Sequence, residues 1–319
     1  MKLHLPNSAF LGNIDPFLQN ININNPDILE ITANKKWISI HPVVLSMVAA
    51  LGLTIKSKNI KFEEIEATSG HYLARMGLFD VLNLETSFKI TKHESTGRFI
   101  PLTRISGSKD LTNFIKEVIP LLHLDPKQVE PIKYIISELV RNVLEHSGSK
   151  HGAIVSAQFY KKSNIIRIGI VDTGEGIKKT ISVSHGVKTD LDAIRLALIP
   201  GITGTTQREG GTEFNAGAGL FFIKSIAAVN RDFFMIYSGN AMYKLLKSKS
   251  LRPRLHADPF KDRYSVKEDL PYWQGTAVGI DISLDNTKEF SVLLNLIREI
   301  YIKTIKERKK QKYKRARFI

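Results

Sequence analysis

Three polar side chains, Glu138, Asn142 and His146, recur at four-residue intervals in the segment from Ile135 to His146. Each step of four residues turns an α-helix by about 40°, so Glu138, Asn142 and His146 form one stripe along a helix. The adjoining arc is apolar and consists of Ile135, Ile136, Leu139, Val140, Val143 and Leu144. Such a stripe borders the buried face, where side chains that line a cleft belong. The segment therefore predicts a core helix with polar groups at the margin of a cavity.

Each of these residue types has a chemical task in a cleft. A carboxylate at Glu138 can orient and deprotonate a water molecule or a hydroxyl group. The amide oxygen of Asn142 is a neutral hard ligand that suits Mg²⁺. Two interpretations remain open for His146: it lies near bound phosphates, or it closes the helix ahead of Ser147 and Gly148. The second interpretation follows because cationic side chains and a following glycine favour a helix C-terminus.

A second motif follows an apolar segment. Residues 164–171 are rich in β-branched side chains and predict a strand that is covered on one face and partly covered on the other. Asp172 stands at the end of this strand, where its carboxylate can accept a hydrogen bond from the exocyclic amine of adenine. Gly174 and Gly176, followed by Ile177, let the backbone approach a bound base. The same run is also typical of an ordinary turn.

A glycine-rich third motif precedes another helix. Residues 201–212 are rich in Gly and Thr, and Gly217 and Gly219 open a helix that continues from Leu220. Free backbone amides at a helix start favour a bound anion such as a phosphate group. The stretch 178–216 has few apolar anchors, so we expect a mobile lid that becomes ordered when ligand binds. Alternatively, the glycines only turn the chain into the helix.

The ordered set Glu-x-x-x-Asn-x-x-x-His, Asp-x-Gly-x-Gly-Ile and Gly-x-Gly-Leu resembles the sequence boxes of the Bergerat-fold ATPases, which include gyrase, heat-shock chaperone, histidine-kinase and mismatch-repair ATPase domains. Gly275 and Thr276 lead the strand 277–282. The family places such a threonine beneath adenine, within reach of Asp172. The resemblance covers about residues 110–300 and implies bound ATP and Mg²⁺. The fold it implies is an α/β sandwich, with a mixed sheet and helices on one face.

The resemblance also assigns roles to individual residues. It implies that Glu138 is the catalytic base and that Asn142 holds the Mg²⁺ ion. The residues that it implies for nucleotide binding are Asn142, His146, Asp172, Gly174, Gly176, Ile177, Gly217, Gly219, Leu220 and Thr276. A first box that ends in His is similar to that of bacterial serine kinases that act as anti-sigma factors. The chain lacks the His-Glu-Leu/Phe-x-x-Pro segment that carries the phosphoacceptor of sensor kinases.

The chain before residue 110 predicts a separate small α/β domain, 1–109, because expected strands and helices alternate. A helix should begin at Pro42, and the expected strands are 28–31, 37–40 and 60–62. This region resembles a degenerate STAS domain, the fold of anti-anti-sigma factors. Valines stand where that family carries its phosphoacceptor, and the nearest hydroxyls are Ser39 and Ser46. The resemblance implies a protein-binding platform without an acceptor.

Charge is concentrated at the end of the chain. The formal net charge is +15, and residues 303–319 carry nine Lys or Arg against one Glu. This basic C-terminal extension follows the predicted ATP-binding domain, 110–302. It could bind the phosphates of nucleic acid or an acidic partner, or it could be a solvated helix end.

Composition excludes several classes of protein. Without cysteine the chain forms no disulfide. It has no apolar run of about 18 residues and no secretion-signal layout at its start, so we expect a cytoplasmic protein that does not span a membrane. Three functions remain open: an ATP-gated switch with slow hydrolysis that acts through a protein partner, a serine/threonine protein kinase of the anti-sigma-factor type, and a nucleic-acid-associated ATPase.

Overall fold

The computed structural model describes residues 1–24, 26–34, 37–62, 67–85, 98–204, 217–250, 254–285 and 290–313. The strands are β1 (Lys2–Leu5), β2 (Ser8–Ala9), β3 (Leu29–Ala33), β4 (Ser39–Ile40), β5 (Ile60–Phe62), β6 (Phe99–Ile105), β7 (Ala153–Tyr160), β8 (Ile165–Asp172), β9 (Phe234–Gly239), β10 (Ala241–Leu245), β11 (Tyr264–Lys267) and β12 (Trp273–Ser283). The α-helices are α1 (Asp15–Gln19), α2 (Pro42–Leu53), α3 (Ala67–Arg75), α4 (Leu78–Leu82), α5 (Ser108–Asn113), α6 (Pro126–His146), α7 (Gly176–Ser182), α8 (Asp190–Ala197), α9 (Gly219–Asn230) and α10 (Phe290–Tyr313). Shorter helical segments are η1 (Ser57–Asn59), η2 (Phe114–Val118), η3 (Ile119–Leu122), η4 (Lys161–Ser163) and η5 (Pro259–Lys261). The chain is thus an α/β protein, as predicted.

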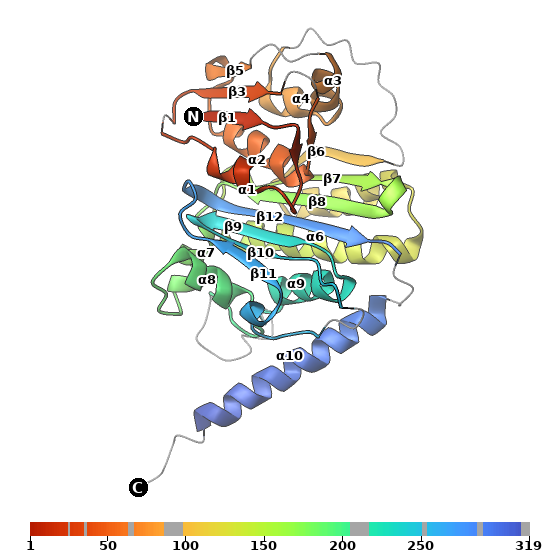
Figure 1. Cartoon of the computed structure of the whole chain (residues 1–319), viewed down its shortest axis with the longest axis vertical. Coiled ribbons are helices and arrows are strands. Elements are labelled where there is room, and N and C mark those ends of the chain that lie inside the picture. The colour runs from red at the N-terminus through yellow and green to blue at the C-terminus, as the bar shows by residue number, and fades with distance from the viewer. Residues whose placement is uncertain are drawn as a thin grey trace.

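A seven-stranded sheet forms the centre of the molecule, in the order β11-β10-β9-β12-β8-β7-β6 (Figure 1). The prediction of a mixed sheet is wrong for these strands, because neighbouring strands pair antiparallel throughout the described sheet. Short connections explain two of these pairs, β7 with β8 and β9 with β10. The strands β9 and β10 are joined through Gly239, whose φ of 62° suits a tight turn, whereas parallel neighbours need a long crossover.

Helices α6, α7, α8 and α9 cover one face of this sheet. The long helix α6 starts with a capping box, in which the Asp125 carboxylate accepts a hydrogen bond from the Lys127 amide and the Gln128 side chain reaches back to the Asp125 amide. Its apolar arc is buried in the core from Ile135 to Val143, and Leu144 is partly buried. The predicted core helix is confirmed.

The opposite face of the sheet is covered by α2, which packs on β7, β8 and β12. The expectation of helices on one face only is therefore wrong. This close packing is possible because β8 and β12 carry glycines there. A Cβ atom at Gly169 would lie 2.3 Å from the backbone nitrogen of Val43, and one at Gly279 would lie 3.1 Å from a methyl group of the same residue. A helix that is apolar all round fits such a fully buried position.

The N-terminal region adds two small sheets, in which β1, β3 and β5 pair parallel, as do β2 and β4. The predicted helix from Pro42 and the strand 60–62 are confirmed. Side chains of this region, such as Leu11 and Val44, share one hydrophobic cluster with sheet residues such as Val171. The region also supplies the edge strand β6 to the large sheet. Residues before 110 therefore pack against the large sheet and supply one of its strands.

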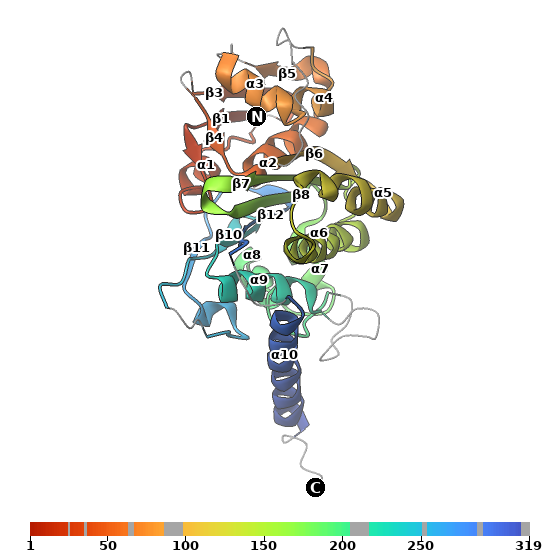
Figure 2. The same cartoon turned by 90° about the vertical axis from the view of Figure 1, so that its right-hand side faces the viewer.

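Helix α10 packs on α9 and α6 at its start and projects away from the rest of the molecule at its end (Figures 1 and 2). The predicted basic extension thus begins inside a helix, and residues 314–319 lie outside the described residues. None of the described helices combines the length and the apolar character needed to cross a membrane.

Candidate functional site

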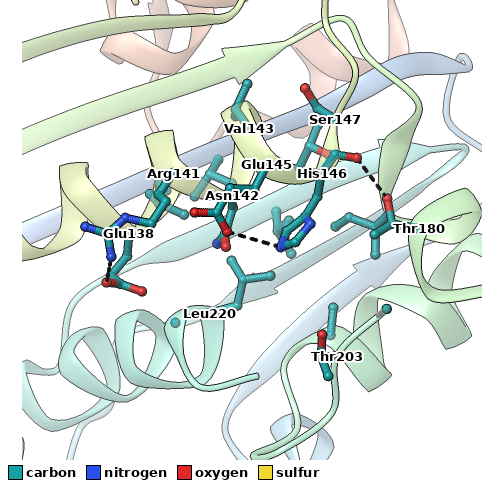
Figure 3. A pocket seen from close by; sticks show the side chains of 18 of the residues that line it. Glu138, Arg141, Asn142, Val143, Glu145, His146, Ser147, Thr180, Thr203 and Leu220 are labelled. Carbon is teal, nitrogen blue, oxygen red and sulfur yellow. Dashed lines mark hydrogen bonds and ion pairs between the residues drawn. The ribbon is translucent and has the colours of Figure 1, made fainter. Parts of the chain in front are cut away.

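A cavity of about 350 Å³ lies between the helices and the sheet (Figure 3). Its walls come from the ends of the three sequence motifs: the stripe on α6, the segment after β8 and the start of α9. The predicted site residues that line it are Glu138, Asn142, His146, Asp172, Gly176, Ile177, Gly217, Gly219, Leu220 and Thr276. Among the predicted residues only Gly174 lies outside this lining. Motifs that are far apart in the sequence therefore meet at one cavity.

The polar stripe of α6 faces the cavity as the helical spacing predicts (Figure 3). An oxygen of the Glu138 carboxylate lies 3.5 Å from the Arg141 guanidinium, and 26% of the glutamate side chain is exposed. Burial raises the pKa of Glu138, while the charge of Arg141 opposes that rise. A carboxylate with a raised pKa that borders a cavity is suited to accepting a proton.

The start of α9 comes into contact with this stripe at Gly219. A Cβ atom at Gly219 would lie 2.8 Å from a carboxylate oxygen of Glu138 and 3.7 Å from the amide nitrogen of Asn142. A larger residue at this position would displace the Glu138 carboxylate, whereas its contact with Asn142 would be ordinary. Among the described residues, no side chain caps the N-terminus of α9. The first backbone amides of this helix are thus available to an anion beside Glu138 and Asn142.

Asp172 also lines the cavity and is only 3% exposed. It pairs in register with Thr276 of β12, and its carboxylate accepts a hydrogen bond of 2.7 Å from the Gly174 amide. Burial raises the pKa of Asp172 to about 6, although the amides of Gly174 and Thr276 lower it in part. No cationic side chain of the described residues pairs with it. Ile170, Ile236 and Val278 add apolar surface.

The glycines after Asp172 also make close contacts within the protein, which the sequence did not predict. A Cβ atom at Gly174 would lie 2.1 Å from the carbonyl oxygen of Ser147, and the Glu175 amide donates to the same oxygen at 2.7 Å. Gly176 has a φ of 77°, which favours glycine. These residues bring the turn after β8 against the end of α6. The close approach is between two parts of the backbone, and it fixes the distance between the first two motifs.

His146 lies in the last turn of α6 and also lines the cavity. Its Nε2 atom is 3.9 Å from a carboxylate oxygen of Glu145, and its carbonyl accepts a hydrogen bond from the Thr180 hydroxyl (Figure 3). His146 therefore lies at the end of α6, as one of the two interpretations expects, and its position beside the cavity leaves the phosphate interpretation open.

Several lining residues were not predicted: Arg141, Glu145, Ser147, Thr180 and Thr203. Arg141 follows Glu138 by three positions, and helical periodicity alone would have placed it beside the stripe. Thr180 could not be found in this way, because it belongs to a segment for which we predicted no helix.

The stretch expected to be a lid is partly helical. Residues 178–204 contain most of α7 and all of α8, and Ile181 and Ile194 anchor these helices in the core. The sequence did not predict these helices because polar residues interrupt the pattern of apolar residues. A capping box at Thr189 also stabilises α8. The rest of the predicted lid, residues 205–216, lies outside the described residues.

The cavity offers oxygen ligands but no complete metal site of its own. Among the residues that the structure describes, no group of three or more His, Asp or Glu side chains could hold a metal ion. Asn142 provides one hard amide oxygen. An Mg²⁺ ion here would need further oxygens from phosphate groups and water, which is how proteins commonly bind this ion with a nucleotide.

Comparisons with protein-family models, with curated proteins and with solved structures gave no match.

Proposed function

We propose that this chain is a Mg²⁺-dependent ATP-binding protein of the Bergerat class, and that it is an ATP-gated switch with slow hydrolysis that acts through a protein partner. The observation that carries this proposal is the arrangement of the cavity. A buried carboxylate lies at its strand end, while a carboxylate, an amide and an uncapped helix N-terminus lie at its α6 end. This polarity matches a ligand with a flat base at one end and phosphates at the other.

Adenine is the base that the strand end favours. One oxygen of Asp172 accepts the Gly174 amide, and the carboxylate has further lone pairs for an amine donor. Adenine offers such an exocyclic amine, whereas guanine carries a carbonyl at the same position. The apolar side chains of Ile170, Ile236 and Val278 suit the faces and edges of a base. Burial of an unpaired carboxylate is costly unless a ligand or amide donors compensate.

Phosphates fit the other end. The amides at the start of α9 favour an anion, and Asn142 lies next to them across Gly219. When Mg²⁺ is bound there it neutralises phosphate charge, and Asn142 would hold it together with phosphate oxygens. Glu138 is within the same group of side chains, so it can orient water toward a terminal phosphate and take its proton. Its ion pair with Arg141 competes for that role, which is consistent with slow hydrolysis.

A protein kinase would need the same acid, so the acceptor distinguishes the two functions. In this chain Ser46 is fully buried on α2 and shares a hydrogen bond of 2.9 Å with Ser156. A kinase acting on its own N-terminal region could not reach this hydroxyl. Ser46 is therefore unsuited as an internal acceptor, and we propose that a kinase of this kind would act on a hydroxyl of a partner. We propose that the STAS-like N-terminal region backs the sheet and presents its outer surface to that partner.

Nucleotide binding tests the proposal directly. Asp172→Asn should weaken Mg²⁺-ATP binding by about 10- to 100-fold. The new amide keeps its oxygen toward the Gly174 amide, so its NH₂ group meets the adenine amine. Asn142→Ala should remove the part of the affinity that depends on Mg²⁺. Isothermal titration measures both, and labelled ATP shows whether phosphate is released or transferred to an added partner.

Asp232→Asn is a matched control. Asp232 is also buried, its pKa is raised to about 7 by burial, and it accepts a hydrogen bond from the Ser283 amide. It does not line the cavity. If Asp172→Asn bound ATP as well as the wild type and the Asp232 variant do, the adenine assignment would be wrong.

A further inference from the structure

The helix α10 has one packed side and one exposed side along the length that the structure describes. Leu293, Ile297 and Ile305 are buried, and Tyr301 packs against Phe221 and Phe222 with ring centroids 6.3 Å and 5.9 Å away. The other side faces solvent as the helix leaves the body of the molecule (Figure 2). The end of α10 is therefore held in a fixed direction by its packed side.

Lysines follow one another on the exposed side. Lys303, Lys306 and Lys310 are separated by three and four residues, so they share a stripe that extends about 10 Å along the helix axis. Within 303–311 the fully exposed residues are all polar or charged. Residues 303–319 together carry nine Lys or Arg and a single Glu. The chain thus presents a row of cations on a projecting helix.

We propose that α10 binds the phosphate backbone of duplex nucleic acid, and that Arg308 couples this contact to the cavity. The coupling rests on the proposed nucleotide binding, whereas the contact with nucleic acid does not. A helix of this diameter fits the major groove of DNA, and lysines along it can reach phosphates.

An acidic protein is the weaker explanation of this surface. Interfaces between proteins gain most from buried aromatic and apolar side chains, and lysine is depleted at their centres. Among the side chains described at 303–311, none that is exposed is aromatic or apolar. Phosphates need no apolar anchor, because binding is driven by release of condensed counterions. The exposed apolar side chains of α10, which are Val292, Leu296 and Ile302, all precede the lysine stripe. The stripe itself, from Lys303 to Lys310, therefore favours nucleic acid.

The link to the cavity is a short chain of contacts. The guanidinium of Arg308 donates a hydrogen bond of 2.8 Å to the carbonyl of Pro200. The residues around Pro200 line the cavity on both sides of it, at Ala197, Ile202 and Thr203. Nucleic acid that holds α10 in place should stabilise this wall and strengthen nucleotide binding.

A short duplex of about 20 base pairs, followed by fluorescence anisotropy at several salt concentrations, tests the contact. The test variant replaces the stripe as Lys303→Gln, Lys306→Gln and Lys310→Gln. The slope of log affinity against log salt concentration should become shallower by about 2.7. Raising salt from about 50 to about 200 mM should therefore weaken binding about 40-fold less in the variant than in the wild type. ATP binding should not change. The control replaces Lys56, Lys58 and Lys61, which are exposed on the N-terminal region, by Gln and should retain the wild-type slope.

Three outcomes decide the first half of the proposal. Binding of DNA or RNA duplex that depends on the stripe supports it, and comparison of the two duplexes shows which is preferred. Equal loss in the control variant overturns it, since any surface lysine would then serve. Absence of duplex binding, or binding of polyglutamate only, also overturns it.

Arg308→Met tests the coupling, because it keeps an aliphatic chain but removes the donor to Pro200. In the wild type, saturating duplex should raise ATP affinity at least fivefold, within the usual range of coupling. In the variant, duplex should still bind, with a salt slope that is lower by at most about 0.9 from one lost charge, and ATP affinity should no longer respond. An unchanged ATP affinity in the wild type would overturn the coupling. If the chain bound duplex but no ATP, the proposed function would fail while the contact would stand.

Discussion

The two faces of the seven-stranded sheet are built from alternate residues of the same strands, yet one face is closed and the other encloses a cavity. On β8, Ile170 and Asp172 point to the helices and the cavity, while Gly169 and Val171 point to the N-terminal region. Buried polar side chains also lie on the closed face. Ser46 and Ser156 share a hydrogen bond, and the buried ring of His41 lies 3.2 Å from Asp281.

A glycine on the closed face and a glycine at the cavity have different surroundings. The space beside Gly169 is occupied by the backbone of α2, so the absence of a side chain there allows the two elements to pack closely. Gly219 leaves space beside the carboxylate of Glu138 and the amide of Asn142 at the edge of the cavity. A glycine in a motif therefore says little by itself. Its neighbours decide whether the space that it leaves is structural or available to a ligand.

The largest effect is expected on the closed face. Gly169→Val places a side chain where the backbone of Val43 already lies, and that backbone cannot shift without moving α2. We expect the free energy of unfolding to fall by about 5 kcal/mol or more. Urea denaturation followed by circular dichroism measures this loss. Gly186→Val is the control, because nothing lies within 4 Å of its Cβ position. Similar losses in both variants would show that the tight packing of α2 is not the cause.

Glu138→Gln should leave the fold intact and affect only chemistry at the cavity. The amide keeps the size of the side chain but cannot take a proton, so ATP turnover should fall by about 10²- to 10⁴-fold while ATP binding persists. Release of labelled phosphate measures turnover. The Gln128→Ala variant, which changes a capping residue at the far end of the same helix, controls for effects on α6. Full turnover in the Glu138 variant would remove this residue as the base.

Sequence alone predicted the open face far better than the closed one. The stripe on α6, the carboxylate after β8 and the glycine before Leu220 all follow local spacing rules, and the cavity gathers them. The docking of α2 depends on Gly169 and Gly279, which lie about 120 to 240 residues further along the chain. Such long-range packing leaves no local pattern. The antiparallel order of the sheet escaped prediction for the same reason, since it depends on which strands become neighbours.

The buried carboxylate of Asp172 on the open face should make the free energy of unfolding depend on pH by about 3 kcal/mol. The pKa of Asp172 rises from 3.8 to about 6 on folding, so between these values the unfolded chain is ionised while the folded chain still holds the proton. Its contribution to stability therefore decreases as pH rises from about 4 to about 6, by about 3 kcal/mol in total. Asp172→Asn should abolish this decrease and be the more stable protein at pH 7.

Urea denaturation at intervals between pH 4 and pH 7.5 measures the effect. Asp232→Asn should show the same kind of gain over a window that reaches about pH 7, because burial raises the pKa of Asp232 to that value. Only the Asp172 variant should also bind ATP more weakly. Parallel stability curves for wild type and the Asp172 variant would mean that the carboxylate is not stabilised in its protonated form by the fold.

The smallest effect expected is local protection of the open face by nucleotide. Amides that exchange through small local openings near the cavity, such as those of 199–204, should slow by about tenfold at a nonhydrolysable ATP analogue concentration ten times its Kd. Amides in exposed segments of the closed side, such as 54–57, should keep their rates, because α2 and the sheet separate them from the cavity. Slow amides that need global unfolding should change alike on both faces and serve as the internal reference. Hydrogen exchange followed by mass spectrometry resolves these classes. Equal slowing of the fast amides on both sides would mean that the closed face also responds to the ligand, and that the sheet does not insulate the N-terminal region from the cavity.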